Sequence, residues 1–216
     1  MAEPQQNRKK GCLPYVIFAT VVLLIGACFG LLYHHWMVNH LTDTQPMTLP
    51  SVKLPDVQMF QLHDRVDTFQ EDVRDGEPTE PLVLSADELN ALIETDPLLA
   101  SLKLKDHLYV SIKGDQLSAQ ISFPAADLGL ARLRGRYINA TGDFHVALTN
   151  GELIIMAKSL SVKGEPVPGN IMREIASENL AERFNDDPRA AAGLKKLKSI
   201  DVKDGKLVIA ARKPGV

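Results

Sequence analysis

Three arginines alternate along one short stretch of the chain, at Arg132, Arg134 and Arg136. Alternate side chains of an extended segment point to the same side, so this spacing predicts three guanidinium groups on one face. The planar guanidinium group matches phosphate and carboxylate groups through paired hydrogen bonds. The stretch therefore predicts contact with lipid headgroups or with an acidic partner, and the alternative is the solvated end of a strand.

The other residues that could do chemistry form no catalytic or metal-binding pattern. The sequence has no Gly-x-Ser-x-Gly turn, no phosphate-binding glycine loop and no His-Glu-x-x-His helix. Its six histidines have no cysteine partners, because both cysteines, Cys12 and Cys28, lie at or inside an apolar run. We therefore predict a protein that is not an enzyme, with no cofactor and no metal site. Acids and bases nearly balance over residues 81–216, which gives no sign of nucleic-acid binding.

An uncharged apolar run covers residues 13–33. It is long enough to cross the ~30 Å hydrocarbon core of a bilayer as one helix. Arg8, Lys9 and Lys10 precede it, so the positive-inside rule predicts a cytoplasmic N-terminus and export of residues 34–216. We therefore predict a cytoplasmic basic tail over residues 1–12, a transmembrane anchor over 13–33 and a location in the inner membrane.

A cleaved signal is the alternative to the anchor. The segment Ile25-Gly26-Ala27-Cys28 is similar to a bacterial lipoprotein cleavage site, with small residues before the cysteine. The apolar run continues past Cys28, which favours an uncleaved span over a 7–15-residue signal core. In either case the exported part stays tethered at a membrane. The tripeptide Asn139-Ala140-Thr141 matches an N-glycosylation site, and we interpret it as a coincidence.

Residues 34–80 contain nine acidic and three basic residues, and we predict that they form an acidic stalk. Prolines favour an extended spacer in its first part, and a helix is expected over residues 56–74. Its apolar residues are spaced 3, 4, 3, 4, which is a two-heptad seam. The seam could pair with a second copy or an envelope protein, or it could dock on its own domain. The residues of the seam are Met59, Leu62, Val66, Phe69 and Val73.

Residues 81–216 contain three predicted hairpins, each centred on a two-residue turn. The turns are Gly114-Asp115, Asn150-Gly151 and Asp204-Gly205. Each turn fixes a register that puts the apolar residues of its two strands on one face. The expected pairs are Leu108 with Ile121, Val110 with Ala119, Ile112 with Leu117, Phe144 with Ala157, Val146 with Ile155, Leu148 with Leu153, Ile200 with Ile209 and Val202 with Leu207. Ile154 and Met156 are exceptions that fall on the polar face.

Helices must cover the apolar face of such a sheet. Ser85 and Glu88 form a capping box that predicts a helix over residues 85–95. Apolar residues recur every four positions over residues 169–184, which predicts an amphipathic helix, and Asp187-Pro188 predicts the start of another. The sequence thus predicts an α+β protein with an N-terminal transmembrane helix, a stalk, and a curved antiparallel sheet of three hairpins with amphipathic helices on one face.

Two segments resemble small bacterial membrane-anchored families of unknown function. They are VLSADELNALI at residues 83–93 and NGELIIMAKSLSVKGEPVP at residues 150–168. Some of these families are assigned the sheet-on-helix fold of the tubular lipid-binding (BPI-like) proteins. The resemblance implies a lipid or other apolar ligand between the sheet and the 169–184 helix, lined by Phe144, Ile155, Met172 and Leu180. The alternative is a protein-interaction or scaffold module of the envelope with no ligand cavity.

Overall fold

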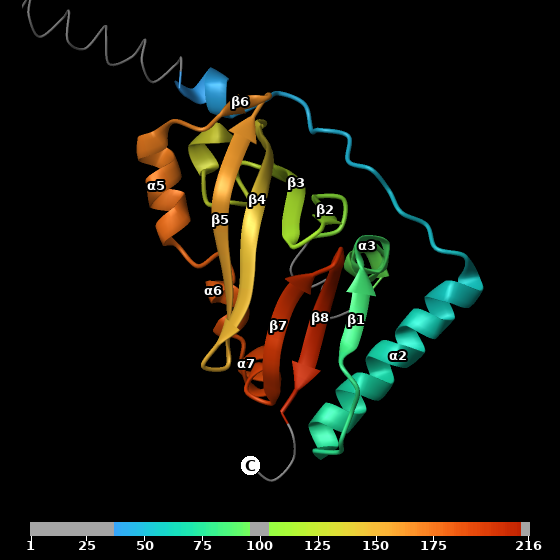
Figure 1. Ribbon diagram of the computed structural model, residues 1–216. Coiled ribbons are helices and arrows are strands. Elements are labelled where there is room, and N and C mark those ends of the chain that lie inside the picture. Colours follow the sequence, from blue (N-terminus) through green and yellow to red (C-terminus); the bar gives the residue numbers. More distant parts are fainter. Residues whose placement is uncertain (1–36, 96–103, 213–216) are drawn as a thin grey trace, which may run out of the picture. The chain divides into compact units, whose positions relative to one another are not determined.

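The structure, a computed structural model, describes residues 37–95 and 104–212 (Figure 1). The chain divides into two units, residues 1–40 and residues 41–216. In the first unit residues 37–40 are described, and they are helical. The expected span over residues 13–33 lies outside the described residues. Among the residues that the structure describes, no helix is long and apolar enough to cross a membrane.

The second unit is α+β, and its strands form two antiparallel sheets. One has three strands in the order β1-β8-β7, and the other has five in the order β2-β3-β4-β5-β6. In chain order the elements are α2 (Asp56–Asp75), β1 (Leu82–Ser85), α3 (Ala86–Thr95), β2 (Leu108–Lys113), β3 (Gln116–Pro124), the 3₁₀ turn η1 (Ala131–Leu133), β4 (Tyr137–Thr149), β5 (Glu152–Val162), β6 (Glu165–Pro166), α5 (Gly169–Ser177), α6 (Glu182–Asn185), α7 (Pro188–Leu194), β7 (Leu197–Lys203) and β8 (Lys206–Ala211).

The three predicted hairpins are confirmed, with every expected residue pair in register. The turns at Asn150-Gly151 and Asp204-Gly205 have positive φ at both residues, as a type I′ turn requires. Gly114 alone has positive φ in its turn, which is the pattern of a type II′ turn. A fourth, short hairpin that was not predicted joins β5 and β6 through Lys163-Gly164.

The prediction of a single sheet was wrong, because the β7–β8 hairpin belongs to the smaller sheet. Strand β1, only four residues long, pairs with β8, so β8 and its hairpin partner β7 form a separate three-stranded sheet with β1. The two sheets meet at their hairpin tips, where Gly205 N donates to Gly114 O at 2.8 Å and Asp204 N donates to Asp115 Oδ1 at 3.1 Å. Strands β4 and β7 also lie in contact, so the larger sheet is covered in part by the smaller one.

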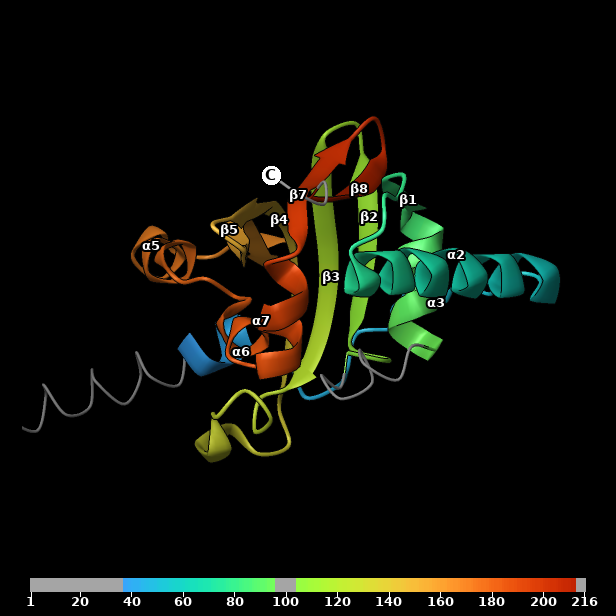
Figure 2. The same cartoon turned by 90° about the horizontal axis from the view of Figure 1, so that it is seen from below.

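Helix α2 packs on the three-stranded sheet beside β1 (Figures 1 and 2). Its seam residues Leu62, Val66 and Phe69 are buried in one cluster with Leu82 and Leu84 of β1. Met59 and Val73 pack at the margin of that cluster. Of the two arrangements that the seam allowed, the structure therefore shows docking on its own domain. Gly76, with φ 78°, ends the helix, and its N–H donates to the carbonyl oxygen of Asp72.

Helix α3 begins with the expected capping box. Ser85 N donates to Glu88 Oε2 at 2.8 Å, and Glu88 N donates to Ser85 Oγ at 3.2 Å. Burial opposes the ionised form of Glu88, but the bonds from Ser85 and the Arg65 guanidinium outweigh it and lower the pKa of this carboxyl. The carboxylate thereby joins α3 to α2, since Arg65 Nη1 lies 2.7 Å from Glu88 Oε1.

The predicted helix over residues 169–184 is broken into two pieces. Helix α5 ends at Ser177, Glu178 is extended, and α6 starts at Glu182. The side chain of Asn179 explains the break, because its Oδ1 accepts from Ile155 N at 3.0 Å and its Nδ2 donates to Leu153 O at 2.9 Å. A continuous helix would carry Asn179 away from β5. The short helix at Asp187-Pro188 is confirmed, with Asp187 as its N-cap.

The helices therefore do not share one face of one sheet, as the sequence had suggested. Helix α3 contacts both β1 and β2, whereas α5, α6 and α7 all contact β5. Figures 1 and 2 both show α5 beside β5. None of its residues is buried.

Candidate functional site

The segment that was expected to form the start of a free stalk is fixed to the domain. Thr42 is 2% exposed, and Asp43 forms an isolated antiparallel bridge with Tyr137 at the start of β4. Asp43 N donates to Tyr137 O at 2.8 Å, and Tyr137 N donates to Asp43 O at 2.8 Å. The compact unit that contains this segment begins at Leu41, whereas the sequence led us to expect the domain from residue 81.

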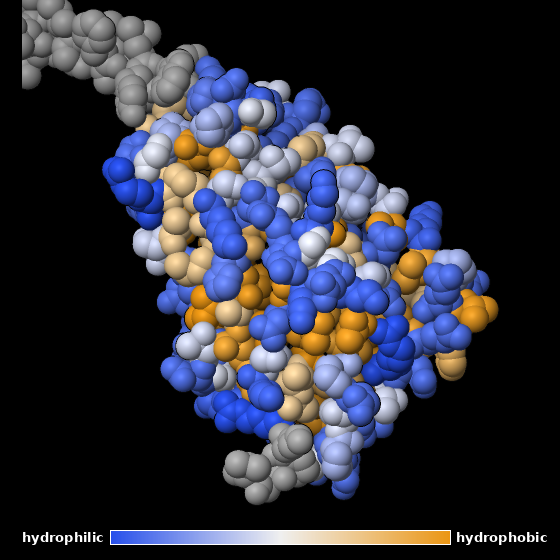
Figure 3. Space-filling view, viewed as in Figure 1, coloured by the Kyte–Doolittle hydropathy of each residue, from blue (hydrophilic) through white to orange (hydrophobic). Residues whose placement is uncertain are grey.

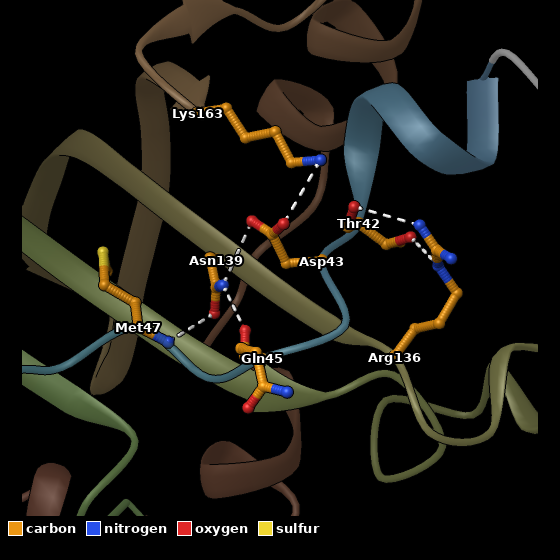
Figure 4. A network of polar contacts seen from close by, with 7 residues as sticks. All are labelled: Thr42, Asp43, Gln45, Met47, Arg136, Asn139 and Lys163. Atoms are coloured by element: carbon orange, nitrogen blue, oxygen red, sulfur yellow. Dashed lines mark hydrogen bonds and ion pairs between the residues drawn. The ribbon is translucent and has the colours of Figure 1, made fainter.

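Asn139 of β4 is the centre of a polar network that holds this segment (Figure 4). Its Nδ2 donates to Gln45 O at 2.8 Å and to Asp43 Oδ2 at 3.3 Å. Its Oδ1 accepts from Met47 N at 3.1 Å and from Ser122 Oγ at 2.8 Å. The side chain is thus fully used, which is what a buried amide requires.

Two cations complete the network. Lys163 Nζ lies 3.3 Å from Asp43 Oδ1. The Arg136 guanidinium donates through Nε to Thr42 Oγ1 and through Nη2 to Thr42 O, the latter at 3.2 Å. We call residues 42–47, together with the side chains of Ser122, Arg136, Asn139 and Lys163, the N-terminal clamp. It joins a segment near residue 45 to parts of the fold about 75 to 120 residues further along the chain.

The clamp holds a segment of backbone in place. Its hydrogen bonds end mostly on backbone groups of residues 42–47. The clamp also bears on the N-glycosylation motif at Asn139, because it leaves the Asn139 side chain inaccessible. Asn139 is 8% exposed and its amide is committed to four hydrogen-bond partners, so a glycan cannot be attached to it in the folded unit.

The predicted stripe of three arginines does not form. Arg132 lies in the 3₁₀ turn η1 and Arg134 in the turn that follows, so the stretch is not extended. Arg132 and Arg134 are exposed, whereas Arg136 is partly buried in the clamp. The physical reason is local, because Leu133 N bonds to Leu130 O and Arg136 N bonds to Leu133 O, which are tight turns and not a strand ladder.

The four residues expected to line an apolar cavity are only partly brought together. Phe144 and Ile155 lie on the same face of the larger sheet, as the register requires, and both are half-buried. Met172 is half-buried on α5. Leu180 donates its N–H to Ile155 O at 2.9 Å, but its side chain is 48% exposed. Leu180 therefore does not line a closed cavity in this structure.

Two pockets among the described residues lie elsewhere, are partly open to solvent and have linings of mixed polar and apolar character. One, of about 500 Å³, is between α2 and α3 and is lined by Gln58, Gln61, Asp64, Arg65, Asp87 and Glu88, with Leu54 and Ser85. The other, of about 160 Å³, lies under residues 49–51 beside Asn90 and Tyr109. Neither resembles the enclosed, mostly apolar cleft of a small-molecule site.

The carboxyl groups of Asp143 and Glu88, both among the described residues, have pKa values below their usual range. Hydrogen bonds from Ser118 and Ser159 to the carboxylate of Asp143 lower its pKa, and the pKa of Glu88 is lowered as well. A general acid at neutral pH needs the opposite shift. Among the residues that the structure describes, no group of three histidine, cysteine, aspartate or glutamate side chains could hold a metal ion.

The important polar residues that the sequence did not reveal are asparagines. Asn139, Asn90 and Asn179 each bond to backbone groups at least twenty residues away. The one available signal was an asparagine at a strand or helix position that the apolar pattern assigns to the interior, as at Asn90, which sits between Leu89 and Ala91.

No family model, curated protein or solved structure matches this chain. The resemblance to the tubular lipid-binding proteins stays a prediction.

Proposed function

We propose that this protein is a membrane-anchored, non-enzymatic module whose folded unit is held close to the outer face of the membrane and works by binding. The observation that carries the proposal is the N-terminal clamp. It fixes the chain at Thr42, and only eight residues separate Thr42 from Tyr33, where the apolar run ends. Such a short connection keeps the folded unit near the membrane surface and does not allow it to extend far from that surface.

A test of the anchor uses the full chain with a C-terminal epitope in a bacterial host. We expect the protein to resist alkaline extraction from membranes, and protease added to spheroplasts to remove the epitope. Deleting residues 13–33 should release the protein into the soluble fraction. Extraction of the unaltered chain at alkaline pH would overturn the anchor.

The ligand that we propose is an apolar molecule, such as an acyl chain, held between α5 and β5. Helix α5 carries apolar residues along one side, namely Ile171, Met172, Ile175 and Ala176, yet all four stay partly exposed. The chain is fixed on both sides of the helix. Val167 N bonds to Leu160 O before it, and Leu180 N bonds to Ile155 O after it. A helix with such ends can move away from the strand and return without unfolding the sheet.

Native mass spectrometry of residues 41–216, exported and purified without detergent, tests this ligand. The fragment must begin at residue 41, since a start at residue 81 would remove α2 from the core. We expect an added mass that solvent extraction releases as acyl lipid. Met172→Asp should abolish it, whereas Arg173→Ala, on the exposed side of α5, should keep it. A clean apo mass together with no uptake of a fluorescent fatty acid would overturn the apolar ligand.

A second candidate function is a contact with another envelope protein, and a specific face of the smaller sheet favours it. Helix α2 packs on the face that carries Leu82 and Leu84. The opposite face carries Val83 next to Val208, with Ala210 beside them, all partly exposed. Figure 3 shows hydrophobic residues gathered over the middle of this sheet. A photo-crosslinker at Val208 should capture a defined envelope protein, and one at the exposed Lys203 should not.

A further inference from the structure

The loop between β3 and β4 is ordered by its own hydrogen bonds. Ala125 is fully buried, and its N–H bonds to Arg136 O at 2.8 Å across the base of the loop. Leu130 N bonds back to Ala125 O at 3.0 Å. Two positive-φ glycines, Gly129 and Gly135, make the reversals. The loop over residues 125–136 is therefore a preformed shape, and Figure 2 shows it projecting from the sheets, with η1 at its tip.

What this loop exposes is unusual for a water-facing surface. Leu128 is 45% exposed and Leu130 is 44% exposed. Arg132 and Arg134 follow directly, both exposed, and neither forms an ion pair with any residue that the structure describes. Leucines beside arginines match the interface of a bilayer, where apolar side chains enter the acyl boundary and cations meet the phosphates.

The clamp determines which end of the unit carries this loop. Arg136 closes the loop and also holds Thr42, so the loop and the first residues of the unit lie at one end (Figures 1 and 4). Eight residues separate Thr42 from the apolar run, and eight residues span at most about 29 Å when fully extended. If residues 13–33 cross a bilayer, the loop stays within reach of its headgroups.

We propose that the 125–136 loop binds the surface of an anionic lipid bilayer, with Leu128 and Leu130 entering the interface and Arg132 and Arg134 contacting lipid phosphates. The proposal rests on the anchor that we proposed above. The short connection raises the local concentration of headgroups around the loop far above that of any free partner. For this reason a bilayer is favoured over an acidic protein as the occupant.

The test places one environment-sensitive fluorophore on the full chain in nanodiscs. In a Cys12→Ser, Cys28→Ser background, Leu130→Cys carries the label, and Glu152→Cys, exposed at the β4–β5 turn, is the matched control. The discs contain phosphatidylcholine alone or with a third of phosphatidylglycerol, and lipid-borne spin labels act as quenchers. We expect quenching of the label at position 130 in anionic discs, and none at position 152.

Arginine variants separate charge from fold. Because each basic residue near an anionic surface is worth about fivefold in binding, Arg132→Gln with Arg134→Gln should lower the docked-to-undocked ratio about 25-fold. Arg132→Lys with Arg134→Lys keeps the charge and should keep most of the quenching. Leu128→Ser should reduce quenching in both kinds of disc.

The outcomes distinguish this proposal from the anchor. Chain that does not co-elute with discs would remove the anchor. Chain that co-elutes but shows no quenching at position 130 would overturn the loop contact and leave the anchor standing. Equal quenching at positions 130 and 152 would mean that the unit lies on its side, which also contradicts the proposal. Quenching that is unchanged by Arg132→Gln with Arg134→Gln would contradict the proposed contact between these arginines and lipid phosphates.

Discussion

Asn90 and Val110 are joined by a pair of hydrogen bonds in which a side chain takes the place of a strand. Val110 N donates to Asn90 Oδ1 at 2.8 Å, and Asn90 Nδ2 donates to Val110 O at 2.7 Å. Asn90 belongs to α3 and is 4% exposed, while Val110 lies on β2, an edge strand of the larger sheet. The helix thereby satisfies backbone groups that an open edge would offer to another chain.

Asn90→Ala should lower the free energy of unfolding by about 2–3 kcal/mol, because two buried backbone groups of β2 lose their partners. Urea denaturation of residues 41–216 measures the change. Asn170→Ala, at an exposed position of α5, is the matched control and should change stability by less than about 0.5 kcal/mol. Equal effects of the two substitutions would show that the contact between Asn90 and β2 does not contribute to the free energy of unfolding.

Asparagine side chains also bind the backbone groups of β5 near the β4–β5 turn. Asn179 and Asn185 both bond to the backbone of Leu153, and Asn179 also accepts from Ile155 N. Asn179→Ala should speed hydrogen exchange at the Ile155 amide and should promote dimers at high concentration, since it opens a strand edge. Exchange mass spectrometry and light scattering measure the two effects. Unchanged protection of Ile155 would contradict this role.

Asn139→Ala should loosen the N-terminal clamp before it unfolds the core. Four hydrogen bonds are lost, so we expect proteolysis within residues 42–47 and faster exchange at the Met47 amide. Lys163→Ala removes the solvent-exposed ion pair with Asp43, and we expect it to lower the free energy of unfolding by less than about 1 kcal/mol. If both variants expose residues 42–47 equally, Asn139 is not the centre of the clamp.

The seam of α2 predicts the outcome of a double substitution. Val66→Asp with Phe69→Asp puts charges into a cluster where both side chains are at most 7% exposed, and should cost about 4 kcal/mol or more. Sedimentation of residues 41–216 should give the same mass before and after the change, provided that the variant remains folded. Loss of a dimer would instead show that the seam pairs with a second copy.

The lowered pKa of Glu88 predicts that the free energy of unfolding depends on pH. Its pKa lies below the usual value of 4.5 in the folded unit, so the unfolded chain binds its proton more readily. The stabilisation is therefore complete above about pH 5 and is lost as the pH falls through the lowered pKa. The stability difference between the native chain and Glu88→Gln should shrink between pH 7 and pH 3 in denaturant titrations. Arg65→Met should remove only part of that difference, because Ser85 N still donates to the carboxylate.

The features predicted well from sequence are those that a few adjacent residues decide. Asn150-Gly151 and Asp204-Gly205 require a specific turn, and that turn fixes the strand pairs on either side. The capping box of Ser85 and Glu88 is equally local. The break after Ser177 was missed because it depends on a side chain, Asn179, that bonds to a strand some 24 residues earlier.

The candidate site was largely hidden from the sequence. Arg132 and Arg134 were identified by their alternation, but the loop that presents them is made by turns, and their neighbours Leu128 and Leu130 carry no pattern of their own. The clamp joins residues about 90 positions apart through Asn139, and no periodicity reports such a contact. Strand β1 was missed because four residues are too few to show alternation.

The clamp also determines how the protein responds to mechanical force. A pull on the chain from the side of residue 41 reaches the Asp43–Tyr137 bridge and the Asn139 bonds first. When they yield, residues 48–55, which precede α2 and have no hydrogen-bonded partner strand in the structure, take up the extension. The load reaches the seam of α2 only after this slack is used. The unit thus has a weak point that gives way before the core, and tension on the tether would free residues 42–47 while both sheets stay folded.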